Sequence, residues 1–142
     1  MSTKVLLVDD EEVFVEALAQ RLEIRGFKVR TAFSGDEALQ KLQKEKADVV
    51  VLDVLMPGKD GIQTLCEIRE AYPITEVIML TGHGTLETGI EGMKLGAFDY
   101  LTKPTETSEL VKKIENACTR KHDHEERIRN AEIDLITKTR GW

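Results

Sequence analysis

Five polar side chains stand at or just beyond the ends of apolar runs in this 142-residue sequence. Continuous valine and leucine runs of this length are typical of parallel strands that are covered on both faces. The carboxyl ends of such strands meet at one edge of an open α/β sheet, and ligands bind in the crevice there. We therefore expect an acid pair, a lone acid, a hydroxyl and an ammonium group to share one edge. The five residues, each with the apolar run that precedes it, are Asp9 and Asp10 after residues 4–8, Asp53 after 48–52, Thr81 after 77–80 and Lys103 after 98–101.

Asp9, Asp10 and Asp53 would crowd three carboxylates into that crevice. Neighbouring residues on a strand point to opposite faces, so Asp9 and Asp10 converge only if Asp10 already lies in the loop. Three uncompensated carboxylates repel one another, whereas Mg²⁺ (or Mn²⁺) accepts such oxygen ligands. Acids also favour a helix N-terminus, and this is the preferred interpretation for Glu11 and Glu12. For Asp9 and Asp10 we predict metal binding.

A divalent cation beside a lone carboxylate, a lysine and a threonine indicates phosphoryl transfer. The Asp53 carboxylate can attack phosphorus and become an acyl phosphate. The metal and Lys103 would neutralise the phosphoryl oxygens, and Thr81 would donate a hydrogen bond to the new group. A threonine at a strand end is a weak signal alone, but the combination of these groups at four strand ends is a strong one.

Apolar runs alternate with helical patterns five times along the chain. This regularity predicts an α/β fold with a doubly wound, five-stranded parallel sheet and right-handed crossovers. Val13, Phe14, Ala17, Leu18 and Leu22 are predicted to line one face of the first helix. The expected strands are 4–8, 27–33, 48–53, 76–80 and 98–101, and the expected helices run near 11–25, 34–45, 61–72, 85–95 and from 107 or 108 onward.

The helix near 85–95 contains Gly89 and Gly92, each of which costs about 1 kcal/mol relative to alanine in a helix interior. Close packing against the sheet explains both glycines. A helix that is selected for low intrinsic stability, directly after Thr81, explains the two glycines equally well. In either case we expect this to be the least rigid helix of the domain.

Four sequence motifs, in order, resemble the receiver domain of bacterial two-component response regulators. The resemblance covers about residues 4–118 and is most similar to receivers of the nitrogen-regulator (sigma-54 activator) type, which commonly precede an ATPase and a DNA-binding domain. It implies a flavodoxin-like sheet of strand order 2-1-3-4-5 with five helices. The motifs are Val-Asp-Asp-Glu at 8–11, Leu-Asp-Val-Leu-Met-Pro-Gly-Lys-Asp-Gly at 52–61, Leu-Thr-Gly-His-Gly at 80–84 and Gly-Ala-Phe-Asp-Tyr-Leu-Thr-Lys-Pro at 96–104.

The resemblance implies a role for each site residue. Asp53 matches the phosphoacceptor, which is charged by a sensor histidine kinase, a phosphotransfer protein or a small acyl phosphate. Asp9 and Asp10 match the pair that holds Mg²⁺, together with Asp53 and the backbone carbonyl of Leu55. Such a chain catalyses its own phosphorylation and dephosphorylation, yet it serves as a signalling switch.

The same resemblance implies how the signal would leave the site. Thr81 and Lys103 match the two phosphate-contacting side chains, and Tyr100 matches an aromatic that turns inward as the threonine moves. The Lys103–Pro104 peptide bond matches a position that is usually cis. Phosphorylation would then switch the 82–118 face to control a partner or an output domain. The alternative is a phosphorylation-independent protein-interaction module of the same fold.

Residues 1–119 are expected to form the receiver and 120–142 a helical or partly disordered C-terminal extension. Ile128, Ala131 and Leu135 keep a spacing of three and four residues, but polar residues interrupt it upstream. Such a broken heptad is either a helix that dimerises, in which case phosphorylation could drive homodimer formation, or a solvated tail.

The composition bounds the partners. A net charge of −6 argues against direct nucleic acid binding or anionic lipid binding by this segment. No apolar run reaches the roughly 20 residues that cross a bilayer, so no membrane association and a cytoplasmic location are expected. A phosphatase of the haloacid dehalogenase type needs a second acid two residues after the nucleophile, and Leu55 stands there.

Overall fold

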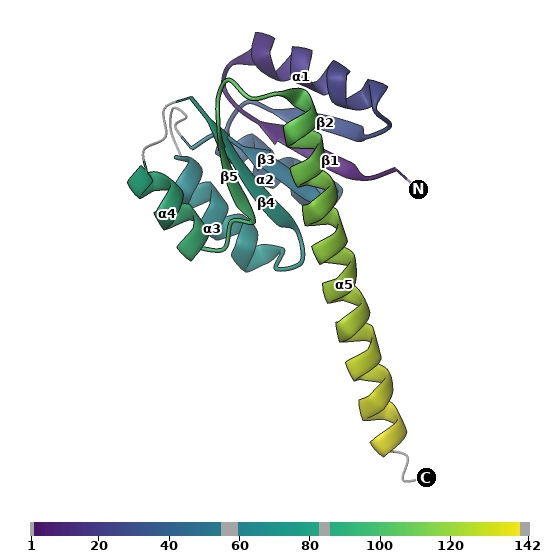
Figure 1. The fold of residues 1–142 in the computed structure, drawn as a ribbon. Helices are drawn as coiled ribbons and strands as arrows, with labels where there is room; N and C mark the ends of the chain where they lie inside the picture. The colour runs from purple at the N-terminus through teal and green to yellow at the C-terminus, as the bar shows by residue number, and fades with distance from the viewer. Residues whose placement is uncertain (1, 55–59, 83–85, 140–142) are drawn as a thin grey trace.

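The chain folds around one five-stranded parallel sheet with helices on both faces (Figure 1). The structure is a computed structural model that describes residues 2–54, 60–82 and 86–139. The strands lie in the predicted order, β2-β1-β3-β4-β5, and every neighbouring pair is parallel. They are β1 (Lys4–Val8), β2 (Lys28–Ala32), β3 (Val49–Leu52), β4 (Glu76–Thr81) and β5 (Asp99–Thr102).

The strand register brings the carboxyl ends of the strands to a common edge. Val8 at the end of β1 lies opposite Leu52 at the end of β3. The next residue, Asp53, still donates its backbone N–H to the Val8 carbonyl at 2.9 Å, so the ladder fixes its position. Thr81 at the end of β4 lies opposite Thr102 at the end of β5. The sheet itself therefore gathers the polar residues that follow these strands.

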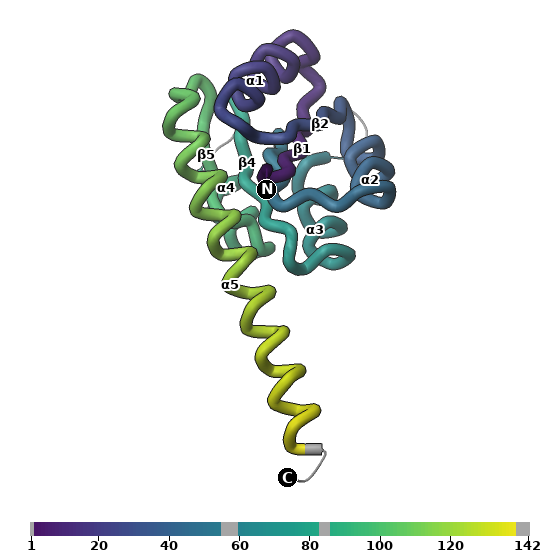
Figure 2. Tube along the Cα trace, turned by 90° about the vertical axis from the view of Figure 1, so that its right-hand side faces the viewer, coloured from purple at the N-terminus to yellow at the C-terminus, as the bar shows by residue number. Residues whose placement is uncertain are grey.

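The helices form two layers, one on each face of the sheet. Helices α1 and α5 lie on one face of the sheet, and α2 and α3 lie on the other (Figure 2), and each pair adds apolar side chains to a buried cluster on its own face. Residues of the three central strands β1, β3 and β4 are buried between the two layers, which explains their unbroken apolar runs. The helices are α1 (Glu12–Ile24), α2 (Gly35–Lys44), α3 (Gly61–Ala71), α4 (Leu86–Lys94) and α5 (Thr107–Thr139).

The predicted buried face of α1 is wrong in two positions. Val13 is 84% exposed and Ala17 is also exposed, whereas Val15 is buried together with Leu18 and Leu22. Leu18 and Leu22 lie on the buried face as predicted, and Val15 keeps the spacing of three and four residues with them, so the helical period was right and the centre of the buried face was displaced. The centre of this face is set by where the loop after β1 starts the helix, and this cannot be read from the apolar residues alone.

Side-chain caps fix the starts of α2 and α3. Ser34 accepts a hydrogen bond from the Glu37 backbone N–H at 3.1 Å and so caps the N-terminus of α2. Asp60 accepts one from the Gln63 backbone N–H at 2.7 Å. The Asp60 cap therefore fixes the start of α3.

The glycines of α4 allow this helix to lie against the sheet. A Cβ atom on Gly92 would overlap the buried side chain of Met79 in β4, and one on Gly89 would come within 3.3 Å of the Tyr100 ring in β5. Both glycines are buried. Of the two explanations that the sequence left open, close packing is therefore the one that the structure supports.

The last helix, α5, is a single 33-residue helix that runs past the body of the molecule (Figure 1). Two ion pairs join α5 to the rest of the domain at the point where the helix extends beyond it. Arg120 pairs through two nitrogens with Glu76, which is 3% exposed at the start of β4. The Lys121 Nζ atom lies 2.8 Å from Oδ1 of Asp48, the residue that precedes β3. In the described ranges, no helix is both long and apolar enough to cross a membrane.

Candidate phosphoacceptor site

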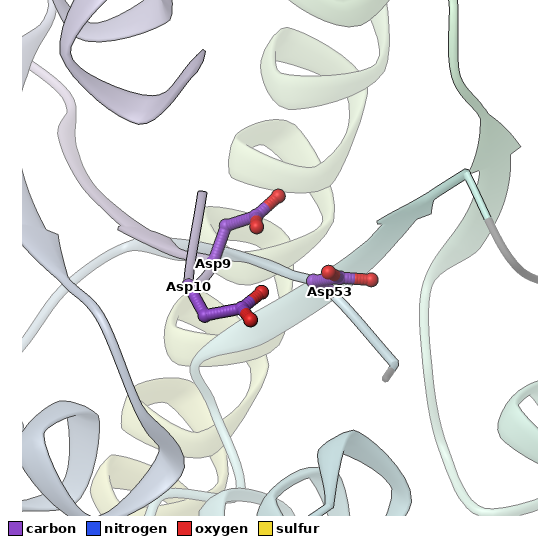
Figure 3. Close-up of side chains that lie close together, drawn as sticks. All are labelled: Asp9, Asp10 and Asp53. Atoms are coloured by element: carbon purple, nitrogen blue, oxygen red, sulfur yellow. The ribbon is translucent and has the colours of Figure 1, made fainter. Parts of the chain in front are cut away.

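Three aspartates converge at the carboxyl edge of the sheet, as the sequence predicted (Figure 3). One carboxylate oxygen from each of Asp9, Asp10 and Asp53 lies within 4.8 Å of the others. Asp9 is 4% exposed and Asp53 is 2% exposed, while Asp10 is exposed. Asp9 and Asp10 can converge because Asp9 continues the ladder, donating its N–H to the Ala32 carbonyl at 3.1 Å, and Asp10 already lies in the loop.

The electrostatics of this cluster suit a cation. Burial raises the pKa of Asp9 above its ordinary 3.8, and the negative charge of Asp53 acts in the same direction. A hydrogen bond from Lys103 and another from the Glu11 backbone N–H act against this rise. Hard carboxylate oxygens, two of them from buried residues, are the donor set that Mg²⁺ or Mn²⁺ prefers. The residues present therefore fit a divalent metal ion.

Lys103 reaches the cluster from the loop after β5. Its Nζ atom donates to Asp9 Oδ2 at 2.5 Å and to Glu11 Oε1 at 3.0 Å. The ammonium group also lies 4.2 Å from the centroid of the Phe14 ring. Burial alone would lower the pKa of Lys103, but the hydrogen bonds to Asp9 and Glu11 outweigh it and raise the pKa. The lysine is therefore a fixed positive charge at this edge.

Thr81 and Tyr100 occupy the neighbouring strand ends. Thr81 is fully buried at the end of β4, and its carbonyl accepts the Lys103 backbone N–H at 2.9 Å. The half-buried Tyr100 side chain lies against Gly89 of α4, and burial raises its pKa. The Lys103–Pro104 peptide bond is cis, as expected. Leu55, the fourth predicted metal ligand, lies outside the described residues.

The sequence interpretation missed the contact between Glu11 and Lys103. Glu11 was expected to act only as an acid at a helix N-terminus, yet its carboxylate binds the lysine. Phe14 was assigned to the buried face of α1, and its ring lies under the same ammonium group. The order of residues carries a partial signal, because Glu11 follows the acid pair in the loop that the lysine must approach.

Comparison with known proteins gives the same assignment. Residues 5–115 match the family of the response regulator receiver domain. An NtrX-like response regulator of Rickettsia felis is 35% identical over 136 residues, which are 94% of this chain and 28% of that protein. This chain thus spans less than a third of the length of this curated relative.

Solved structures agree in fold. A receiver domain protein from Clostridium thermocellum is 41% identical, with a TM-score of 0.80 over 84% of this chain and 97% of that one. NtrX from Brucella abortus, solved in complex with ADP, is 33% identical, with a TM-score of 0.84 over 89% of this chain and 29% of that one. Together with the match over most of the sequence, they show that this chain belongs to the response regulator receiver domain family.

Proposed function

We propose that this chain is a phosphoryl-accepting receiver in which Asp53 takes a phosphoryl group from a histidine kinase or a phosphotransfer protein. The observation that carries the proposal is the meeting of Asp53 with Asp9, Asp10 and Lys103 at one edge of the sheet. The family membership supports it, because receivers are the phosphorylated partners in two-component signalling. A cytoplasmic location follows from such a role.

The transfer is a substitution at phosphorus. An oxygen of the Asp53 carboxylate forms a bond to phosphorus while the bond from phosphorus to the donor atom breaks, and the donor keeps that electron pair. The donor atom is a histidine nitrogen in the partner or the acyl oxygen of acetyl phosphate. Asp9 and Asp10, with Asp53, would hold Mg²⁺ or Mn²⁺, which supplies positive charge to the phosphoryl oxygens when bound.

Lys103 and Thr81 are assigned to the phosphoryl group itself. The Lys103 ammonium, already at this edge, neutralises charge on the phosphoryl oxygens. The Thr81 hydroxyl at the end of β4 donates a hydrogen bond to the same group. Thr81 lies opposite Thr102 in β5, two residues after Tyr100, and the Tyr100 ring lies against Gly89 of α4, so a shift of Thr81 would change the packing of Tyr100 and α4. This differential contact would switch the face formed by 82–118.

Phosphorylation by acetyl phosphate tests the proposal. With Mg²⁺, the wild-type chain should gain the mass of one phosphoryl group, labile to hydroxylamine, and Asp53→Asn should gain none, by intact-mass spectrometry. Asp134→Asn, an exposed acid of the α5 extension, is the matched control and should behave as the wild type. When beryllofluoride is added, amide hydrogen exchange across 82–105 should slow in the wild type and should not change in Asp53→Asn. Full phosphorylation of Asp53→Asn would contradict the assignment and favour an interaction module that needs no phosphorylation.

A further inference from the structure

The Lys103 ammonium is held on one side of the site by three neighbours. Asp9 and Glu11 accept hydrogen bonds from it at 2.5 Å and 3.0 Å, and the Phe14 ring lies under it at 4.2 Å. The side chain of Lys103 is 13% exposed and that of Glu11 is 56% exposed. Asp9 belongs to the proposed metal site, but nothing in that role accounts for Glu11.

Glu11 is tied to the same cluster through its backbone. Its N–H donates to Asp9 Oδ1 at 3.0 Å, while its side chain meets the lysine that binds Asp9 Oδ2. Asp9, Glu11 and Lys103 thus close a ring of three hydrogen bonds. The Glu11 carboxylate is therefore held near the ammonium group by a fixed backbone, which lowers the entropy cost of the ion pair.

We infer that Glu11 is a positioning residue that holds Lys103 beside Asp9 and competes with the incoming phosphoryl group for it. An ammonium group has three N–H donors, and two of them are occupied by Asp9 and Glu11 in this structure. Phosphoryl oxygens on Asp53 are negatively charged, as the Glu11 carboxylate is, and would attract the same ammonium group. Of the two carboxylates, that of Glu11 is the more exposed, so it is the partner that the lysine gives up at the lower cost.

This inference rests on the proposed function and makes Glu11 a brake on phosphorylation. Glu11→Gln removes the negative charge and keeps the size of the side chain. Exposed ion pairs are weak, so the expected gain in the rate of phosphorylation by acetyl phosphate is about two- to fivefold. The gain should appear at saturating Mg²⁺, where any change in metal affinity no longer matters.

The matched control is Glu12→Gln. Glu12 is the next residue and is exposed in the first turn of α1, and the described structure shows no ion pair between it and Lys103. The substitution therefore removes the same charge from the same edge of the sheet without affecting the contacts of Lys103. A general effect of charge on the anionic phosphodonor would appear equally in both variants. A competition for the lysine would appear in Glu11→Gln alone.

A binding measurement at equilibrium tests directly whether Glu11 competes with the phosphoryl group for Lys103. The affinity for beryllofluoride with Mg²⁺, measured by fluorine NMR, should rise about two- to fivefold in Glu11→Gln. This gain should disappear when Lys103→Ala is combined with it in a double-mutant cycle. An equal rate in Glu11→Gln and Glu12→Gln, or a slower rate in Glu11→Gln, would overturn the inference. A wild-type chain that is not phosphorylated at all would instead overturn the proposed function.

Discussion

At the scale of single residues, the site combines groups that repel one another with groups that compensate. Asp9 is buried beside Asp53, yet it keeps two partners of its own, the Lys103 ammonium and the Glu11 backbone N–H. Asp10 is exposed and adds a third negative charge at the same place. The consequence is that the two members of the acid pair differ: Asp9 has structural partners to lose, whereas Asp10 mainly contributes repulsion when no cation is bound.

We expect Asp10→Asn to stabilise the metal-free chain and to weaken its stabilisation by Mg²⁺. Relief of repulsion between partly solvated carboxylates should raise the free energy of unfolding by roughly 0.5 kcal/mol, and loss of a ligand should remove most of the gain that Mg²⁺ gives the wild type. Urea titrations at pH 7 with and without Mg²⁺ measure both. Asp123→Asn, an exposed acid on α5, is the control. A less stable metal-free Asp10→Asn would show that Asp10 has a structural partner.

At the scale of elements, the packing of α4 depends on the absence of side chains at two positions. Gly89 and Gly92 bring it onto Tyr100 and Met79, so the helix lies close to the strand ends that carry Thr81 and Lys103. Two glycines also make α4 intrinsically weak as a helix. Close approach and low propensity thus come together, which favours an element that responds to a change at the neighbouring strands.

Gly92→Ala should destabilise the chain although alanine is the better helix former. The new methyl group would overlap the fully buried Met79 side chain, and such overpacking costs about 1–3 kcal/mol, more than the gain of about 1 kcal/mol in helix propensity. Glu91→Ala, at an exposed position of the same helix, should be neutral or stabilising. Thermal or urea unfolding of the two variants decides the point. A more stable Gly92→Ala would mean that Met79 moves aside freely.

The elements also show why some of the structure could be predicted and some could not. The strand runs depend on local sequence and are confirmed, and the bond before Pro104 is cis, as the motif implies. The exposure of Val13 depends on how α1 is rotated about its own axis when it packs on the sheet, and this rotation is set by the tertiary structure. The contact between Glu11 and Lys103 joins residues 92 positions apart, and its side-chain directions follow only from the folded register.

At the scale of the whole molecule, ion pairs at the amino edge of the sheet join the long helix to the body. Asp48 accepts the Lys4 backbone N–H and the Lys121 ammonium, both at 2.8 Å, and Arg120 lies on the Phe98 ring while it pairs with Glu76. These contacts lie at the opposite edge from the aspartate cluster. They were not predicted, because the sequence does not show which charges of a polar run face the sheet.

Asp48→Asn should lower the free energy of unfolding at neutral pH by about 1.5–3 kcal/mol, the range for hydrogen bonds to a charged group. Burial alone would raise the Asp48 pKa, but Lys121 and the Lys4 N–H hold it below the ordinary 3.8. A carboxyl with a lowered pKa in the folded state stabilises the protein above 3.8, and this contribution is lost as the pH falls through the folded-state value. The difference between wild type and variant should therefore shrink as the pH falls from 7 to about 3.

Urea unfolding at successive pH values measures this difference. Asp123→Asn, an exposed acid on α5, is the control and should show little difference from the wild type at either pH. A difference that stays constant down to pH 3 would mean that Asp48 stabilises the chain through its shape and not through its charge.

The anchored α5 helix also has a mechanical consequence. Thr139 lies eighteen positions after Lys121, and at a rise of about 1.5 Å per residue this part of the helix extends roughly 27 Å from the anchor. A helix of this length acts as a lever whose fulcrum is the pair of ion pairs at Arg120 and Lys121. A tilt of about 10° at the fulcrum would move the far end by about 5 Å. Small rearrangements within the compact body would thus be amplified into displacements large enough for a neighbouring domain or a second chain to sense.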